Sequence, residues 1–303
     1  MLSMSAQFEV LLFYKYVEIE NPVSLMRTQR CLCEQLNLKG RIIVSTEGIN
    51  GTVEGTKSET SKYIDAITKD PRFTDVNFKK SIGDGNSFRK LSVKVRPEIV
   101  TTLIPNLMPW KLTGKHLSVH DLHQWFTEKR EFYIVDMRND YEYISGQFEG
   151  SVLSGFSNFK DLPQVLPKLE HLKNKTIVTV CTGGVRCEKA SAFLLTNGFT
   201  DVYQLENGIQ TYMEAYPNEH FKGKLYVFDN RLTIAFNTDS ISHEIIGKCM
   251  HCGEACDTYV NCMNHVCHLH FICCETCKDV ETGLAFCSEK CREIALQKQR
   301  SII

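Results

Sequence analysis

The sequence predicts a protein of mixed class, in which an α+β domain is followed by an α/β domain and a cysteine-rich segment. The first 100 residues follow a strand–helix–strand–strand–helix–strand order. Further along, apolar strands alternate with helices, which indicates a parallel sheet with helices on both faces. Ten of the 14 cysteines fall between Cys249 and Cys291. We therefore expect an α+β domain over 1–100, a linker over 101–115, an α/β domain over 116–230 and a cysteine-rich segment over 231–303.

The N-terminal elements have the order of a small ferredoxin-like domain. The apolar stretch FEVLLFYKYV (8–17) predicts the first strand, and the apolar spacing over 22–38 predicts a helix that ends at Lys39-Gly40. RIIVSTEGINGTVEG (41–55) predicts two short strands joined through Glu47-Gly48. A second helix is expected at about 57–68, and FRKLSVKVRPEIV (88–100) alternates as the closing strand.

The second domain follows a linker that contains Pro105, Pro109 and Gly114. Ligands of open parallel sheets bind beyond the carboxyl ends of the strands, and Asp136 and Cys181 both come at such ends. The expected elements are a helix at 119–129, a strand at 132–136, a helix at about 161–173, a strand at 176–180, a helix at 187–197 and a strand at 199–205.

The stretch VTVCTGGVRCEKAS (178–191) places a cysteine between a buried strand and a helix start. A glycine-containing loop there can turn its N–H groups inward as an anion-binding nest, and the helix adds its unsatisfied donors. A thiol held over such a ring ionises easily, because the donors favour the thiolate. A buried, inert cysteine is the alternative. We predict that Cys181 is a nucleophile and that Arg186 closes its cradle, which consists of Thr182, Gly183, Gly184, Val185 and Arg186.

A local basic cluster lies between residues 72 and 96, a segment that contains seven Lys or Arg residues and two Asp residues. Such a cluster can supply sequence-independent affinity for a phosphate backbone, although a solvated sheet edge is the alternative. The candidate phosphate contacts are Lys79, Lys80, Arg89 and Lys90. The net charge of the whole chain is only -1, so any surface for nucleic acid must be local.

The late cysteines occur mostly as pairs with Cys-x2-Cys or Cys-x4-Cys spacing, which lets one turn present two thiolates to a tetrahedral zinc ion. Eight ligands would make two closed structural sites, whereas free thiols or disulfides formed on isolation are the alternatives. Cys274 is preferred to Cys273 because it gives the x2 spacing to Cys277. The alternative ligands are Cys256, Cys273, His251, His265, His268 and His270. The candidate ligands are Cys249, Cys252, Cys262, Cys267, Cys274, Cys277, Cys287 and Cys291, and their grouping stays open.

The composition is that of an ordinary globular protein, with 43% hydrophobic and 23% charged residues. No stretch has the roughly 18–20 uncharged apolar residues of a membrane span. The start lacks the basic region and cleavage site of a signal peptide, so we expect a reducing, cytoplasmic location. The glycines of STEGINGTVEG do not fit GxGxxG, so no flavin or NAD motif is expected.

The segments CTGGVRCEKAS (181–191) and DMRNDYEYISGQFEGS (136–151) resemble a rhodanese domain. Together with STEGINGT (45–52) and the late cysteine cluster, they make the whole chain similar to the rhodanese-related tRNA uridine hydroxylase family. Rhodanese domains often have Gly-His where this chain has Gly146-Gln147. That histidine is not a reacting group in the family, so the difference leaves the expected catalysis unchanged.

The resemblance implies an oxidoreductase that uses molecular oxygen to hydroxylate C5 of the wobble uridine in tRNA, which gives 5-hydroxyuridine. It places Cys181 at the family's essential cysteine. The loop alone also suits a sulfurtransferase that carries a persulfide on Cys181. A phosphatase is disfavoured because the loop from Cys181 to Arg186 is one residue shorter than the ring that suits phosphate, and a non-enzymatic zinc protein is disfavoured by the intact cysteine. The oligomeric state is not specified.

Overall fold

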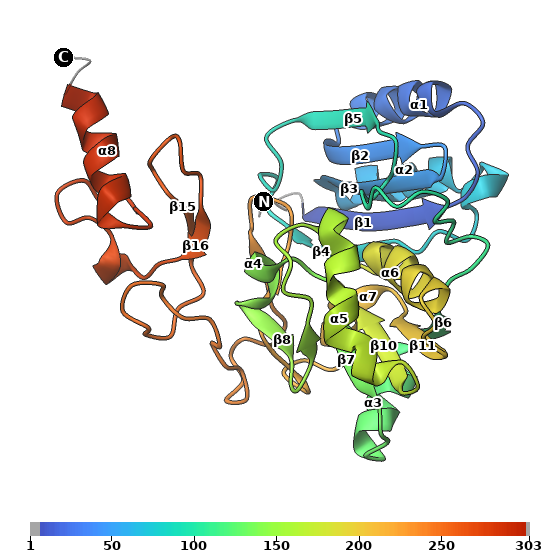
Figure 1. The fold of residues 1–303 in the computed structure, drawn as a ribbon. Coiled ribbons are helices and arrows are strands. Elements are labelled where there is room, and N and C mark those ends of the chain that lie inside the picture. Colours follow the sequence, from blue (N-terminus) through green and yellow to red (C-terminus); the bar gives the residue numbers. More distant parts are fainter. Residues whose placement is uncertain (1–6, 301–303) are drawn as a thin grey trace.

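The computed structural model describes residues 7–300, and its N-terminal part is one five-stranded sheet with two helices on one face (Figure 1). The strand order is β4-β1-β3-β2-β5, with β5 parallel to β2 and the other neighbours antiparallel. The elements are β1 (Phe8–Tyr16), α1 (Pro22–Gln35), β2 (Lys39–Ser45), β3 (Gly48–Thr56), α2 (Lys57–Ile67), the 3-10 turn η1 (Pro71–Phe73), β4 (Lys79–Gly83) and β5 (Leu91–Val95).

Both helices of this domain begin at side-chain caps. The Asn21 side chain accepts from the Ser24 N–H ahead of α1, and Thr56 forms a capping box with Glu59 ahead of α2. Their apolar faces pack on alternate residues of the sheet, among them Leu11 and Phe13. This arrangement confirms the predicted ferredoxin-like class.

The predicted closing strand is wrong in one respect. The fourth strand of the ferredoxin-like order is β4, and the predicted segment supplies β5, which adds a fifth strand beside β2. The sequence did not predict β4 because Lys79 and Ser81, which alternate along it, do not enter the hydrophobic core between the sheet and its helices. They lie on the opposite face of the sheet.

That opposite face follows from the strand register, since side chains alternate between the two faces of a sheet. Leu12 pairs with Lys79 on one side and with Thr52 on the other, and Thr52 in turn pairs with Arg41. The next row contains Tyr14, which pairs with Asn50. These two rows face the second domain, because a Cβ built at Gly183 would lie 2.7 Å from Leu12 and one at Gly184 would lie 2.9 Å from the Tyr14 hydroxyl.

The second domain is a five-stranded sheet of order β6-β11-β10-β7-β9, in which every pair is parallel, as predicted. Its strands are β6 (Lys115–Leu117), β7 (Tyr133–Asp136), β9 (Val152–Leu153), β10 (Thr176–Val180) and β11 (Asp201–Leu205). One apolar cluster joins one face to α3 (Val119–Thr127) and α7 (Gly208–Ala215). Another joins the other face to α5 (Leu166–Leu169) and α6 (Val185–Thr196). A short helix α4 (Asp140–Tyr143) follows β7.

The helix predicted at about 161–173 is broken into three short pieces. The structure has the 3-10 segment η2 (Phe159–Val165), α5, and the 3-10 segment η3 (Glu170–Leu172). Pro163 lies inside the first piece and Pro167 at the start of the second. A proline lacks the N–H that a continuous helix needs, so the helix cannot run through.

The C-terminal part contains short two-stranded pairings and one terminal helix. β12 (Phe221–Gly223) pairs with β8 (Gly146–Phe148), which ties this part to the second domain. The other elements are β13 (Leu225–Tyr226), β14 (Thr233–Ile234), β15 (Tyr259–Asn261), β16 (His270–Ile272), the 3-10 turn η4 (Glu275–Cys277) and α8 (Glu289–Arg300). Within residues 7–300, no helix is long and apolar enough to cross a membrane.

Candidate active site and cysteine clusters

Cys181 follows the last residue of β10, and its side chain is fully buried. The loop then turns sharply into α6 through Gly184, whose φ of +96° is one that residues with a Cβ rarely adopt. This turn lets the Gly184 N–H donate to Sγ of Cys181 over 3.2 Å. The sequence-predicted cradle, a thiol above inward-pointing amides at a helix start, is therefore what the chain forms locally.

The first turn of α7 fixes the other side of the loop. The N–H of Ile209 donates to the Cys181 carbonyl over 2.9 Å, and the N–H of Gln210 donates to the Thr182 carbonyl over 3.1 Å. The approach is possible because residue 208 is glycine: a Cβ there would lie 2.6 Å from the Cys181 carbonyl oxygen and the Gly184 nitrogen. The loop is thus held between two helix starts.

The Cys181 thiol is acidic despite its burial. Burial by itself raises the pKa of this thiol, but a hydrogen bond from the Cys187 thiol, the charge of Arg186 and the amides of Cys187 and Arg186 lower the pKa to about 6. Burial and the neighbouring Cys181 raise the pKa of Cys187. At neutral pH, Cys181 is therefore the thiolate and Cys187 the thiol that donates to it.

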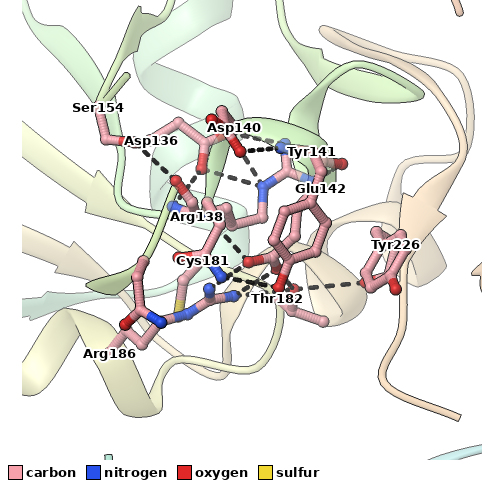
Figure 2. Close-up of polar contacts among 12 residues, drawn as sticks. Asp136, Arg138, Asp140, Tyr141, Glu142, Ser154, Cys181, Thr182, Arg186 and Tyr226 are labelled. Atoms are coloured by element: carbon pink, nitrogen blue, oxygen red, sulfur yellow. Dashed lines mark hydrogen bonds and ion pairs between the residues drawn. The ribbon is translucent and has the colours of Figure 1, made fainter. Parts of the chain in front are cut away.

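Arg186 closes the loop, but its two guanidinium N–H ends are not free as the sequence suggested. They make a bidentate ion pair with Glu142 of α4, with Nη1–Oε1 at 2.5 Å and Nη2–Oε2 at 2.7 Å (Figure 2). Both side chains are buried, so the pair fixes the guanidinium while its charge still acts on Cys181. Sequence reasoning missed Glu142, whose carboxylate also accepts from the Asn139 N–H over 2.9 Å. The available signal was the Asn-x-x-Glu spacing, which is typical of a helix start.

A second buried ion pair holds the segment that carries Glu142. Arg138 donates to both carboxylate oxygens of Asp136, with Nη2–Oδ2 at 2.6 Å (Figure 2). Its Nη2 also donates to the Gly146 carbonyl over 2.7 Å. Asp136 was expected near Cys181 at the functional edge. Here it anchors Arg138, and through it the loop from β7 to β8, rather than facing the thiol.

The open face of the N-terminal sheet covers the Cys181 loop and encloses a cavity of about 380 Å³. The residues of this sheet face approach the Cys181 loop closely: a Cβ at Gly183 would lie 2.7 Å from Leu12, and one at Gly184 would lie 2.9 Å from the Tyr14 hydroxyl. Cys181 and Arg186 line this cavity from the second domain, while Asn50, Thr52 and Arg41 line it from the N-terminal sheet. The Cys181 residue therefore lies at a chamber formed by two domains.

The basic cluster divides in the structure. Lys80, Arg89 and Lys90 are exposed, but Lys80 pairs with Leu11 and therefore projects from the helix-covered face of the sheet, where its Nζ lies 3.6 Å from a Glu9 carboxylate oxygen. Lys79 is only 5% exposed, so the expectation that it contacts phosphate is wrong. Its ammonium lies 5.0 Å from the centre of the Tyr14 ring and has no hydrogen-bond partner within the described chain. Burial lowers the pKa of Lys79 to about 8.

The eight predicted metal ligands lie in two groups of four, and the groups interleave along the chain. Cys249 and Cys252 meet Cys274 and Cys277, whereas Cys262 and Cys267 meet Cys287 and Cys291. Within each group, all the sulfur atoms lie within 4.8 Å of one another. Neighbouring sulfurs are 3.5–3.7 Å apart, close to the ~3.8 Å edge of a tetrahedron with ~2.3 Å zinc–sulfur bonds. The donor set and spacing therefore fit zinc.

A third group with possible metal ligands, which sequence reasoning did not find, contains His123, Glu219 and His220. His123 belongs to α3, and the other two follow α7, so no local motif links them. The first turn of α7 contacts the Cys181 loop, and this eight-residue helix is about 12 Å long. The group that follows it therefore lies away from the reactive thiol.

The comparisons with known proteins cover almost the whole chain. The family models that match are the UPF0176 acylphosphatase like domain over 8–99, the rhodanese-like domain over 118–215 and the rhodanase C-terminal domain over 222–292. Among solved structures, a rhodanese-like domain protein from Staphylococcus aureus is 28% identical, with a TM-score of 0.29, and the match covers 36% of this chain and 98% of that one.

Two curated relatives carry the name tRNA uridine(34) hydroxylase. The protein from Cytophaga hutchinsonii is 41% identical over 285 residues, which are 94% of this chain and 90% of that protein. The protein from Bacillus licheniformis is 41% identical over 293 residues, which are 95% of this chain and 89% of that protein. Identity over at least 94% of the chain extends across both domains. The chain therefore belongs to the tRNA uridine(34) hydroxylase family.

Proposed function

We propose that this protein is an oxidoreductase that hydroxylates C5 of the wobble uridine in tRNA, with molecular oxygen as co-substrate and Cys181 as the essential thiol. The observation that carries the proposal is the 41% identity to proteins named for this activity over 94% of the chain. The Cys181 loop supports it, because the Gly184 N–H and the charge of Arg186 favour the thiolate form of Cys181.

The role of Cys181 is that of a nucleophile at the bottom of a chamber. The thiolate is the reactive form of cysteine, and a pKa of about 6 makes it dominant at neutral pH. Arg186 and Gly184 stabilise its negative charge, and Glu142 keeps Arg186 in place. These residues keep Cys181 ionised, so no separate base is needed to deprotonate it.

The size of the cavity favours a nucleoside over a small sulfur donor. Cavities of roughly 300–1,000 Å³ are typical of sites that enclose drug-sized molecules, and the volume here is about 380 Å³. Thiosulfate would need only the immediate cradle of Cys181. The sulfurtransferase alternative rests on that cradle alone, so the roof of the cavity is the feature that separates the two functions.

We assign tRNA backbone contacts to exposed basic residues of the N-terminal domain, which are Lys80, Arg89 and Lys90. We also assign the two cysteine groups to structural zinc, because four thiolates close the coordination shell and leave no position for a substrate. Bound zinc would hold the short hairpins of the C-terminal part together. We propose a cytoplasmic location, because thiolate ligands and a tRNA substrate both suit a reducing compartment.

The test is nucleoside mass spectrometry of tRNA lacking 5-hydroxyuridine after incubation with the protein under ¹⁸O₂ and a thiol reductant. The reductant supplies the two electrons and two protons with which the second oxygen atom leaves as water. Wild-type protein should form 5-hydroxyuridine that contains ¹⁸O, and Cys181→Ser should form none while keeping the wild-type melting temperature. Thiocyanate production from thiosulfate and cyanide is measured in parallel. Brisk thiocyanate production without 5-hydroxyuridine would establish the sulfurtransferase instead, and wild-type turnover by Cys181→Ser would remove Cys181 from the mechanism.

A further inference from the structure

A tight turn at 227–232 forms a third wall of the cavity. The N–H of Val227 donates to the Leu232 carbonyl over 2.8 Å, and the N–H of Leu232 donates to the Asp229 carbonyl over 3.0 Å. Inside the turn, Arg231 and Asp229 form an ion pair with Nη2–Oδ2 at 2.6 Å. The turn is therefore closed by its own contacts.

The same turn is fastened to the N-terminal domain. Nη1 of Arg231 donates to the Ser81 hydroxyl over 2.9 Å and to the Ile82 carbonyl over 2.8 Å, both on β4. Asn230 donates its N–H to the Ser87 carbonyl over 2.9 Å and its Nδ2 to the Asn86 carbonyl over 2.7 Å. Four hydrogen bonds to the other domain leave the turn little freedom to move.

This rigid turn presents one aromatic ring to the cavity. Phe228 is 46% exposed, whereas its neighbours Val227 and Asp229 are each 6% exposed. Phe228 lines the cavity together with Cys181, and the guanidinium carbon of Arg186 lies 5.6 Å from the centre of its ring. The Tyr226 ring meets it edge-on, with centroids 5.4 Å apart. A large apolar ring on a fixed turn above the reactive loop is not explained by core packing.

We propose that Phe228 is the stacking platform for a pyrimidine base that leaves the anticodon loop and enters the cavity. This assignment rests on the proposed function, which requires C5 of a uracil ring to reach a thiol that is buried between two domains. An enzyme that acts on a base must take it out of the stack, and an unpaired loop makes this step inexpensive. Stacking on an aromatic face suits such a base, because it needs no partner strand.

The rest of the cavity complements a nucleotide. Asn50, Thr52 and Gln210 line the walls and offer donors and acceptors to the edge of the base. Arg41 is exposed and lines the cavity from β2, where it can meet a phosphate. The two contacts make different predictions: stacking on Phe228 is insensitive to salt, whereas a phosphate contact by Arg41 contributes about one unit to the log–log salt slope.

The experiment measures binding of an anticodon stem-loop RNA that contains uridine at the wobble position and 2-aminopurine beside it. All variants are made in the Cys181→Ser background, so that no turnover occurs. Binding should raise the 2-aminopurine fluorescence as the neighbouring uridine unstacks. Phe228→Ala should abolish most of this rise and weaken binding about 5- to 150-fold, the loss expected for one stacked base, with an unchanged salt slope.

Phe228→Trp should keep the fluorescence rise and bind within about threefold of the parent, because stacking needs an aromatic face rather than phenylalanine itself. Ile241→Ala, which removes a fully exposed apolar side chain, is the matched control and should change nothing. Arg41→Ala should flatten the salt slope by about one unit and keep the fluorescence rise.

The outcomes separate the two proposals. If Phe228→Ala binds and unstacks the RNA like its Cys181→Ser parent, and Phe228→Ala with Cys181 intact hydroxylates tRNA as fast as wild type, the platform is refuted and the function stands. If the RNA binds with a Phe228-dependent fluorescence rise but wild-type protein forms no 5-hydroxyuridine, the base site stands and the hydroxylase fails. Equal losses in Phe228→Ala and Phe228→Trp would mean that the turn itself is disrupted, which also overturns the stacking role.

Discussion

Replacing Cys187 with alanine should raise the pH at which Cys181 becomes reactive. The Cys187 thiol donates to the Cys181 thiolate and helps to lower the Cys181 pKa to about 6. A hydrogen bond to a charged group contributes about 1.5–3 kcal/mol, and one pKa unit corresponds to about 1.4 kcal/mol. Without this donor, the pKa of Cys181 should rise by about one to two units, to about 7–8.

A rate measured at one pH would hide this change. At pH 7.4, a rise in pKa from about 6 to about 7.5 lowers the thiolate fraction about twofold, whereas the intrinsic nucleophilicity rises about four- to sixfold. The variant would therefore react about twice as fast at that pH, although its thiol is the weaker acid. The quantity to measure is the midpoint of the whole pH profile.

The assay is timed alkylation with iodoacetamide between pH 5 and 9, followed by digestion and quantification of the Cys181 peptide by mass spectrometry, which separates this residue from the C-terminal cysteines. Wild type should show a midpoint near pH 6 and Cys187→Ala one near pH 7–8. Cys187→Ser keeps a hydroxyl donor and should fall between them. A wild-type midpoint at the ordinary thiol pKa, or an unchanged midpoint in Cys187→Ala, would refute the reasoning.

Four other expectations can be checked directly. Lys79→Met should raise the unfolding free energy at pH 7 by up to about 3 kcal/mol in denaturant titrations. The folded-state pKa of Lys79, about 8, lies below the unfolded value of 10.5, so wild-type stability falls as the pH drops from 10.5 towards 8. The variant should lose that pH dependence, and an unchanged or lower stability would contradict the prediction. Glu142→Gln should cost about 3–5 kcal/mol in the same titrations, since it leaves Arg186 charged and buried without its partner, and a cost below about 1 kcal/mol would contradict the buried pair. Elemental analysis should find about two zinc ions per wild-type chain and about one per chain of Cys274→Ser. Cys273 lies outside both groups, so Cys273→Ser should keep two. Zinc-free wild-type protein would refute both sites. Replacing Lys80, Arg89 and Lys90 together with alanine should flatten the log–log salt slope of tRNA binding by about 2–3 units and leave thiosulfate turnover unchanged. An unaltered slope would mean that these residues do not contact tRNA.

The sequence by itself determined what depends on neighbours along the chain. The cradle of Cys181 is one continuous strand–loop–helix unit, so its glycines and its helix start could be recognised from a short segment. The alternation over 8–17 and the strand at 176–180 reappear as β1 and β10 because period and hydrophobicity are local properties. The cysteine ligands could be named for the same reason, since each pair lies within one turn.

Only the tertiary structure decided what depends on contacts between distant segments. Glu142 lies 44 residues from Arg186, and the two meet because α4 and α6 both begin at the carboxyl edge of the parallel sheet. The cysteine pairs interleave because hairpin packing, rather than spacing, selects which pairs share a site. Lys79 was expected at the surface as one of several basic residues, and it is buried because β4 places it on the sheet face that covers the second domain. The cavity above Cys181 follows from the same packing: no single segment contains it, since its roof, floor and side wall come from three parts of the chain.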